Sequence, residues 1–242
     1  MLRKSHDYKF ERQVFQTAFC GLAAPTDPQK ARKAITMKAL LINGSPRAKG
    51  CTYTALTELE RTLVSDGIET ELIHVGNKDI RGCTACRRCH ELGKCVFDDV
   101  VNEVAPKLAE ADAFVIGAPV YFSSPAGGAV SFMDRLFFST IGIDKTMKVG
   151  AAVVTCRRGG NTASFDVLNK YFMMTGMPVA SSQYWNMVYG GSAEEVARDA
   201  EGLQTMRTLG HNMAFMMKSF RLGKEKFGLP EKERPVFTNF YR

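Results

Sequence analysis

The chain has 242 residues, 45% hydrophobic and 24% charged, which suits an ordinary folded protein of one large α/β domain or two small ones. Its formal charge is +7, but residues 1–36 carry seven Lys/Arg against three Asp/Glu, so the remainder is only mildly basic. This distribution argues against a nucleic-acid partner, and no apolar run reaches the roughly 18 residues that a membrane helix needs.

Residues 1–36 precede the first strong strand pattern, and we expect them to be an appended N-terminal arm of unknown role. The segment VFQTAFCGLAAP is interrupted by polar residues and follows Asp7 and Glu11, so it is a poor signal peptide. We therefore expect a cytoplasmic protein, whose reducing compartment disfavours structural disulfides.

Strand and helix patterns alternate from Lys38 onward. Apolar runs predict buried strands over 38–43, 69–75, 113–120 and 148–155, with a weaker fifth strand over Pro178–Val188. Helical periodicity follows each strand, and a capping box at Ser192–Glu195 opens a long helix to about Leu222. This order predicts an α/β domain over 37–222, with a parallel sheet covered on both faces and an extended tail over 223–242.

The loop after the first strand, GSPRAKGCT (44–52), has the chemistry of a phosphate site. The hydroxyls of Ser45 and Thr52, the guanidinium of Arg47 and the amides at a helix start could hold an anion. The Walker and dinucleotide patterns both fail here, because Gly50 is followed by Cys51 and only two glycines are present. A turn that merely connects strand and helix remains the alternative.

Four cysteines follow the second strand with the spacing C-x2-C-x2-C-x5-C: Cys83, Cys86, Cys89 and Cys95. Zinc sites usually pair two knuckles across a longer span, whereas three cysteines spaced by two with a fourth nearby are more typical of an iron–sulfur cluster. From the spacing, a cluster, zinc and a metal-free loop all stay open. Because ligands bind at the carboxyl ends of parallel strands, we expect this loop at the same sheet edge as the phosphate loop.

Three segments together resemble a known family: LLINGSPRAKGCT, the cysteine loop ending in CVFDD, and ADAFVIGAPVYFSSPAGGAVSFMDR. They are similar to the flavodoxin-like NAD(P)H-dependent FMN reductases and their iron–sulfur flavoprotein relatives, from Lys38 to at least Asn186. The resemblance implies a doubly wound five-stranded parallel sheet of order 2-1-3-4-5 that binds FMN. It says less about the substrate, because this fold serves many acceptors.

The resemblance also implies site residues. The FMN phosphate would be bound by Ser45, Arg47, Cys51 and Thr52, with Cys51 at a position where relatives often carry Asn. The isoalloxazine ring would be lined by Pro119, Val120, Tyr121, Phe122 and Ser123. Independently of the resemblance, the loop after the fourth strand lies between a buried strand and a helix, and it offers Thr155, Arg157, Arg158, Gly159 and Gly160 as further cofactor-binding residues. There the glycines permit close approach, and Arg157 or Arg158 would stabilise reduced flavin. In iron–sulfur relatives the compact cysteines hold a [4Fe-4S] cluster.

The expected activity is FMN-dependent oxidation of NAD(P)H, with electrons passed to a small acceptor such as a quinone, nitro, azo or flavin compound. No protein side chain is expected to be catalytic, because flavin N5 carries the chemistry. The alternative is an iron–sulfur flavoprotein that carries electrons between FMN, a [4Fe-4S] cluster and a ferredoxin-like protein. A redox-sensing, flavin-binding regulator is a third, less favoured reading.

We also expect a homodimer or higher homo-oligomer. The candidate interface is one apolar helix, for which core packing is an equal alternative; its large residues are Met213, Phe215, Met216, Met217 and Phe220.

Overall fold

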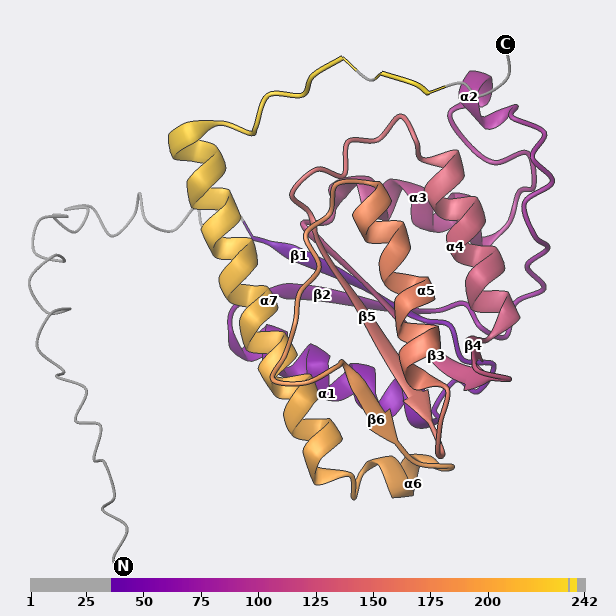
Figure 1. Ribbon diagram of the computed structural model, residues 1–242, viewed down its shortest axis with the longest axis vertical. Helices are drawn as coiled ribbons and strands as arrows, with labels where there is room; N and C mark the ends of the chain where they lie inside the picture. The colour runs from indigo at the N-terminus through magenta and orange to yellow at the C-terminus, as the bar shows by residue number, and fades with distance from the viewer. Residues whose placement is uncertain (1–35, 235, 239–242) are drawn as a thin grey trace, which may run out of the picture. The chain divides into compact units, whose positions relative to one another are not determined.

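The structure is a computed structural model that describes residues 36–234 and 236–238, so the expected arm over residues 1–36 lies outside it except for Thr36. Figure 1 shows a sheet with helices on both faces. In chain order the elements are β1 (Lys38–Asn43), α1 (Cys51–Ser65), β2 (Glu69–His74), α2 (Cys89–Leu92), α3 (Val100–Glu110), β3 (Ala113–Tyr121), β4 (Ser124–Pro125), α4 (Gly127–Ser139), β5 (Val149–Cys156), α5 (Asn161–Met174), β6 (Met187–Tyr189), α6 (Ala193–Val196) and α7 (Ala200–Phe227).

The parallel part of the sheet has the order β2-β1-β3-β5-β6, and β4 pairs antiparallel with the end of β3. Counting only the parallel strands gives the predicted order 2-1-3-4-5, so the expected flavodoxin-like fold is confirmed. The order reverses between β1 and β3, which is where a doubly wound sheet leaves a crevice at its carboxyl edge.

Two apolar layers hold the helices on the sheet. Leu40 and Ile42 of β1 face α3, α4 and α5, whereas Ala39 and Leu41 face α1 and α7. Side chains alternate between the faces of a strand, so a continuous apolar run is what a strand covered on both sides requires. Met213 and Met217 belong to the second layer, where they are buried, while Phe215 is 72% exposed. Core packing therefore accounts for these two methionines of the candidate interface helix.

Two strand predictions differ from the structure. The fifth strand does not span Pro178–Val188: β6 begins only at Met187, and before it Val179 makes a single bridge to Gly150. In the intervening stretch Ser181–Gln183 are polar, and the Ser182 hydroxyl bonds to the Tyr184 carbonyl and the Asn186 side chain, so its hydrogen bonds are local rather than part of the sheet. The short strand β4 was not predicted, because its turn, Phe122-Ser123, lacks the Asn or Gly that usually marks a tight hairpin.

The predicted long C-terminal helix is two helices. Ser192 caps α6 as expected, but the Glu195 carboxylate accepts from the amide of Gly191 rather than that of Ser192. Asp199 then starts α7 by accepting from the amide of Gly202. Helix α7 continues five residues beyond the predicted end at Leu222, with Lys224, Glu225 and Lys226 as good helix formers, and stops at Gly228 with φ of 75°. Residues 223–227 therefore belong to the helix and not to the predicted extended tail.

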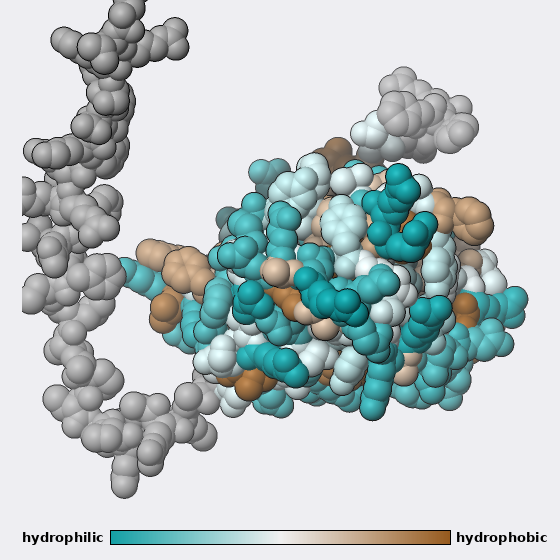
Figure 2. All heavy atoms as spheres, turned by 90° about the horizontal axis from the view of Figure 1, so that it is seen from below, coloured by the Kyte–Doolittle hydropathy of each residue, from teal (hydrophilic) through white to brown (hydrophobic). Residues whose placement is uncertain are grey.

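The surface is largely hydrophilic where α6 lies. Figure 2, which views the molecule from that end, shows mainly hydrophilic side chains with small, separate hydrophobic areas. Within the described part of the chain, no helix combines the length and hydropathy needed to cross a membrane.

Candidate functional site

The loop between β1 and α1 is braced by a buried asparagine. Asn43 Oδ1 accepts from the amide of Ser45 at 3.0 Å, and Asn43 Nδ2 donates to the carbonyl of Ala48 at 3.1 Å. His74 Nε2 lies 2.7 Å from the carbonyl oxygen of Ser45, which can only accept, so this ring nitrogen carries the hydrogen. The bond ties the loop to the end of β2, a role for His74 that its isolated position in the sequence did not reveal.

Close backbone contacts set the path of the same loop. A Cβ on Gly76 would come within 2.2 Å of the Ser45 carbonyl oxygen, so only glycine lets β2 end so close to the loop. The Gly44 amide donates to the Gly117 carbonyl at 2.8 Å, which extends the pairing of β1 and β3 into the loop. Ser45 is consequently buried, while Arg47 is exposed at the loop tip.

Helix α1 begins beside these residues without a side-chain cap, because its N-cap is Gly50. The first amides of a 15-residue helix therefore point toward the loop, where the helix dipole favours an anion. Cys51 turns its thiol toward the Gly190 carbonyl at 3.5 Å, and partial burial raises its pKa. These features fit a phosphate group held by backbone amides with Arg47 nearby.

Thr52 joins two of the predicted loops. Its hydroxyl lies 2.9 Å from that of Thr155 at the end of β5, and both side chains are buried. The sequence placed these threonines in separate loops, and the structure brings them together across the sheet. Each hydroxyl can donate or accept, so the pair satisfies both groups without water.

The predicted ring-lining segment forms the hairpin between β3 and β4. Pro119 and Val120 are half-buried, Tyr121 is 48% exposed, and the Phe122 side chain is fully exposed. Phe122 and Ser123 have φ of 51° and 59°, a left-handed conformation that non-glycine residues rarely adopt. Such local strain is retained where the surroundings enforce it, and it is common at ligand sites.

Gly160 presses against that hairpin from the loop after β5. Its φ is 88°, and a Cβ there would lie 2.7 Å from Ser123 Cα, so the position requires glycine. By contrast, Gly159 is exposed and a Cβ on it would meet nothing within 4 Å. The structure thus brings the loops after β3 and β5 into contact, as a shared ligand site requires.

The two arginines of this loop are both exposed. Arg157 lies along the next connection, since a Cβ on Gly191 would be 3.6 Å from Arg157 Cδ. Cys156 just before them is buried, and that burial raises the pKa of its thiol. The loops after β1, β3 and β5 therefore leave cations, backbone amides and exposed aromatic rings at one sheet edge, which suits a flavin with a terminal phosphate.

The cysteine loop, residues 82–99, starts at this edge but does not stay there. A Cβ on Gly82 would lie 4.0 Å from Oγ of Ser131 in α4. Further along the loop, Cys95 Sγ lies 3.3 Å from Arg135 Nε, and Cys89 Sγ lies 3.9 Å from the Phe138 carbonyl oxygen. With a helix rise of about 1.5 Å per residue, Phe138 lies roughly 16 Å along α4 from its start at Gly127. The loop thus leaves the sheet edge and carries its cysteines along the outside of α4 (Figure 1), contrary to our expectation.

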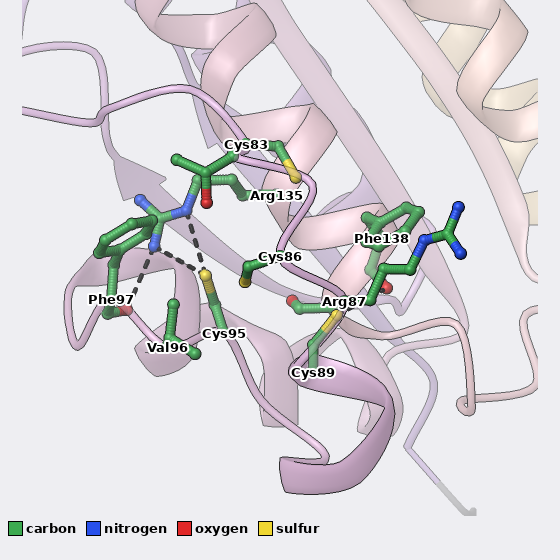
Figure 3. A pocket seen from close by; sticks show the side chains of 11 residues that line it. Cys83, Cys86, Arg87, Cys89, Cys95, Val96, Phe97, Arg135 and Phe138 are labelled. Atoms are coloured by element: carbon green, nitrogen blue, oxygen red, sulfur yellow. Dashed lines mark hydrogen bonds between the residues drawn. The ribbon is translucent and has the colours of Figure 1, made fainter.

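All four cysteines line one cavity, together with residues of their own loop and of α4, among them Arg135 and Phe138 (Figure 3). None of the predicted flavin-binding residues is part of its lining, so the cysteines do not form a wall of the flavin site. The six described cysteines are all free thiols. Burial and the neighbouring thiols of Cys86, Cys95 and Cys83 raise the pKa of Cys89, whereas the Arg88 backbone amide lowers that of Cys86.

The spacing of these side chains bears on the kind of metal centre. Within residues 36–234 and 236–238, no three His, Cys, Asp or Glu side chains are gathered as they would be around a single metal ion. A four-iron cluster requires a different arrangement of ligands. Each of its four cysteines binds a different iron, so the sulfur atoms lie farther apart than they do around a single metal ion. Four thiols that line one cavity supply the type and number of ligands that such a cluster needs.

Arg135 closes the cavity on the side of α4. Its Nε and Nη2 each lie 3.3 Å from Cys95 Sγ, and its Nη1 makes an ion pair with Asp99 at 2.5 Å (Figure 3 shows the contacts with Cys95). Asp99 also caps α3, accepting a hydrogen bond from the Val101 amide. The prediction did not include Arg135, although an arginine among Phe132, Met133, Leu136 and Phe137 on an apolar helix face was a usable signal.

Asn102 fixes the backbone of the same end of the loop. Its Oδ1 accepts from the Cys95 amide at 3.0 Å, and its Nδ2 donates to the carbonyls of Cys95 and Phe97 at 3.0 and 3.2 Å. The segment Cys95–Asp99 is therefore held by side chains from both α3 and α4.

Comparison with known proteins agrees with this geometry. The family model described as NADPH-dependent FMN reductase matches residues 37–192. An iron-sulfur flavoprotein of Methanocaldococcus jannaschii is 34% identical over 189 residues, which cover 75% of this chain and 98% of the relative.

Two solved structures share the fold. RosB, solved with a bound 8-demethyl-8-formylriboflavin-5'-phosphate intermediate, superposes with a TM-score of 0.62 at 15% identity, covering 86% of this chain and 93% of RosB. A flavodoxin from the domain Archaea superposes with a TM-score of 0.52 at 16% identity, covering 75% of this chain and 99% of the flavodoxin. With the topology, the phosphate loop and the family match in agreement, the chain belongs to the flavodoxin-like NADPH-dependent FMN reductase and iron–sulfur flavoprotein family.

Proposed function

We propose that this FMN-dependent oxidoreductase also holds a [4Fe-4S] cluster on Cys83, Cys86, Cys89 and Cys95 and works as an electron-transfer flavoprotein. The observation that carries the proposal is that four free thiols line one cavity, with the buried cation of Arg135 on the sulfur of Cys95. The likeness to an iron-sulfur flavoprotein over 98% of its length supports the same reading.

The residues of the chain would divide the work between two places. At the sheet edge, Ser45 and Arg47 with the first amides of α1 would hold the FMN phosphate, and the Tyr121–Ser123 hairpin would border the ring. Along α4, the four thiolates would each ligate one iron. When bound, FMN would supply two-electron hydride chemistry and the cluster one-electron transfer.

Anaerobic purification followed by iron, acid-labile sulfide and flavin assays tests the cluster. We expect about four iron and four sulfide per chain after reconstitution, the composition of the cluster itself, with one FMN. A visible spectrum should then combine flavin bands with a broad cluster shoulder. Less than about one iron per chain after reconstitution would remove the cluster from the proposal while leaving FMN binding intact.

NAD(P)H is the second element of the proposal, as the donor of hydride to FMN. Two observations favour it: the family model is described as NADPH-dependent, and Arg157 and Arg158 are exposed cations beside the proposed ring site, where an anionic nucleotide could dock. The electron acceptor would be a small quinone, nitro, azo or flavin compound. If electrons leave the protein through the cluster, the acceptor would be a ferredoxin-like protein.

Steady-state assays with NADPH, NADH and reduced ferredoxin, each with a quinone acceptor, separate these electron donors. Flavin reduction by either nicotinamide would support hydride transfer. Reduction by ferredoxin alone would support the pure electron-carrier alternative and reject the nicotinamide. The predicted homodimer stays a proposal, which light scattering on the FMN-loaded protein would test.

A further inference from the structure

Arg135 is the largest fully buried side chain among the described residues, with 1% of its surface exposed. Its guanidinium lies between two partners, Asp99 and Cys95. Nη1 and Nη2 bind the Asp99 carboxylate at 2.5 and 3.0 Å, while Nε and Nη2 both bind Cys95 Sγ at 3.3 Å. Nη2 also donates to the Phe97 carbonyl at 3.1 Å.

A buried cation is costly unless it is paired and its hydrogen-bond donors are used. Asp99 supplies the opposite charge, so the arginine needs no second anion for neutrality. Nevertheless two of its N–H groups donate to the sulfur of Cys95, and a sulfur is a weak hydrogen-bond acceptor when it belongs to a neutral thiol. The arrangement is much better matched to a sulfur that carries negative charge, as a ligating thiolate does.

This contact makes the four cysteines unequal. Cys83 and Cys86 are exposed, and the nearby Arg87, Arg88 and Lys94 side chains are also exposed to water, which screens their charge. Within the described chain, Cys95 is the loop cysteine that receives hydrogen bonds from a buried cation. The electrostatic influence of the protein on a bound cluster would therefore act mainly through Cys95.

We infer that Arg135 is a positioning residue that raises the reduction potential of the cluster through its two hydrogen bonds to Cys95 Sγ. The inference rests on the proposed function, because it needs a cluster on these cysteines. A one-electron reduction adds negative charge to the cluster and its sulfurs, with no bond made or broken at Arg135. Donors aimed at a sulfur stabilise the reduced form more than the oxidised form, which favours reduction.

The test is a redox titration of the reconstituted cluster, followed by electron paramagnetic resonance, in the wild type, Arg135→Gln and Asn102→Ala. Gln removes the charge and the fork of donors, so the ratio of reduced to oxidised cluster at a fixed potential should fall at least tenfold. For a one-electron couple this is a downward shift of about 59 mV. Asn102→Ala loosens the same loop end without touching the sulfur or the charge, so its potential should stay near that of the wild type.

Arg135→Lys provides the second variant. Lysine keeps the charge but loses the planar fork, so its potential should lie between those of the wild type and Arg135→Gln. If Arg135→Gln folds poorly, Arg135→Lys carries the test alone, and a wild-type potential in it overturns the inference.

Two further results would overturn the inference. One is a cluster reduction potential in Arg135→Gln equal to that of the wild type. The other is a shift in Asn102→Ala as large as that in Arg135→Gln, because anchoring of the loop would then explain both shifts. A wild-type protein without iron would instead reject the cluster itself, so failure of the proposed function is recognised before any variant is compared.

Discussion

The flavin loops and the cysteine loop both connect a strand to a helix, yet they are held in different ways. In the flavin loops Asn43, Ser45, Thr52 and Thr155 are buried and hydrogen-bonded, and glycines bring backbones into contact. In the cysteine loop every residue from 82 to 88 is exposed, and the firm attachments are at its far end, Cys95–Asp99.

This difference separates a preorganised site from a partly organised one. The flavin loops have already lost most of their conformational freedom in the folded chain, so binding there costs little further ordering. The segment that carries Cys83 and Cys86 would gain much of its order from what it ligates, as metal sites coupled to folding do. Four predictions test this contrast between the two loops.

Cys86→Ser should abolish the cluster and spare the flavin. Loss of one thiolate leaves one iron without its ligand in the least anchored part of the loop, so iron should fall from about four to below one per chain. FMN content should remain near that of the wild type, because the cavity contains none of the flavin loops. Iron and flavin assays on the purified variant measure both.

Cys156→Ala is the matched control, a cysteine outside the cluster loop. It should keep its iron. Equal iron loss in both variants would mean that the cysteine loop has no special role.

Gly160→Ala should weaken FMN binding about tenfold, or roughly 1.4 kcal/mol. The new Cβ would lie 2.7 Å from Ser123 Cα at a φ of 88°, so the hairpin beside the ring must shift. Gly159→Ala, with nothing within 4 Å of its Cβ, should bind FMN like the wild type. Titration of flavin fluorescence compares the two, and equal affinities would contradict a preformed contact between the loops.

Thiol reactivity in iron-free protein should report the same contrast as a function of pH. The Arg88 amide lowers the pKa of Cys86, whereas burial raises the pKa of Cys51 and of Cys156. Only the thiolate reacts, so alkylation of Cys86 should set in at lower pH than that of an ordinary thiol, and alkylation of Cys51 at higher pH. Near pH 8 we expect Cys86 to react about tenfold faster, as read by peptide mass mapping. Modification of Cys51 at the same rate would argue against an ordered flavin site.

The smallest effect concerns Arg157 and Arg158. Each is exposed, so its attraction to a reduced flavin is screened and worth up to about 1 kcal/mol. Replacing either with Ala should lower the two-electron potential of bound FMN by about 20 mV. Potentiometric titration of each variant measures this, and the absence of a downward shift in both would remove the proposed role of the cation.

Much of the fold could be read from the sequence, because a buried parallel strand has an unmistakable pattern. The first four predicted strands agree with β1, β2, β3 and β5 to within one residue at each end. The predicted fifth strand, Pro178–Val188, was too long. Its mixture of apolar and polar residues does not define a strand by itself, so tertiary contacts decide which residues join the sheet. The hairpin at Phe122-Ser123 was not predicted, because both residues have a positive φ that phenylalanine and serine rarely adopt.

The candidate site was predictable in its residue types and less so in its geometry. Spacing predicted that the four cysteines belong together, and the structure places them on one cavity. Their position along α4 depends on contacts with residues some 40 to 50 positions away, such as those of Cys95 with Arg135 and of Cys89 with Phe138, which no local pattern contains. His74 and Arg135 were missed for the same reason.

The bond from the Gly44 amide to the Gly117 carbonyl has a consequence for hydrogen exchange. It makes the first residue of the phosphate loop a continuation of the central β1–β3 ladder, so this amide can exchange only when the middle of the sheet opens. The phosphate loop therefore shares the stability of the whole domain, whereas the exposed segment 82–88 lies outside that ladder and can open without it. A chain that loses its cluster would, on this account, still present a folded flavin site.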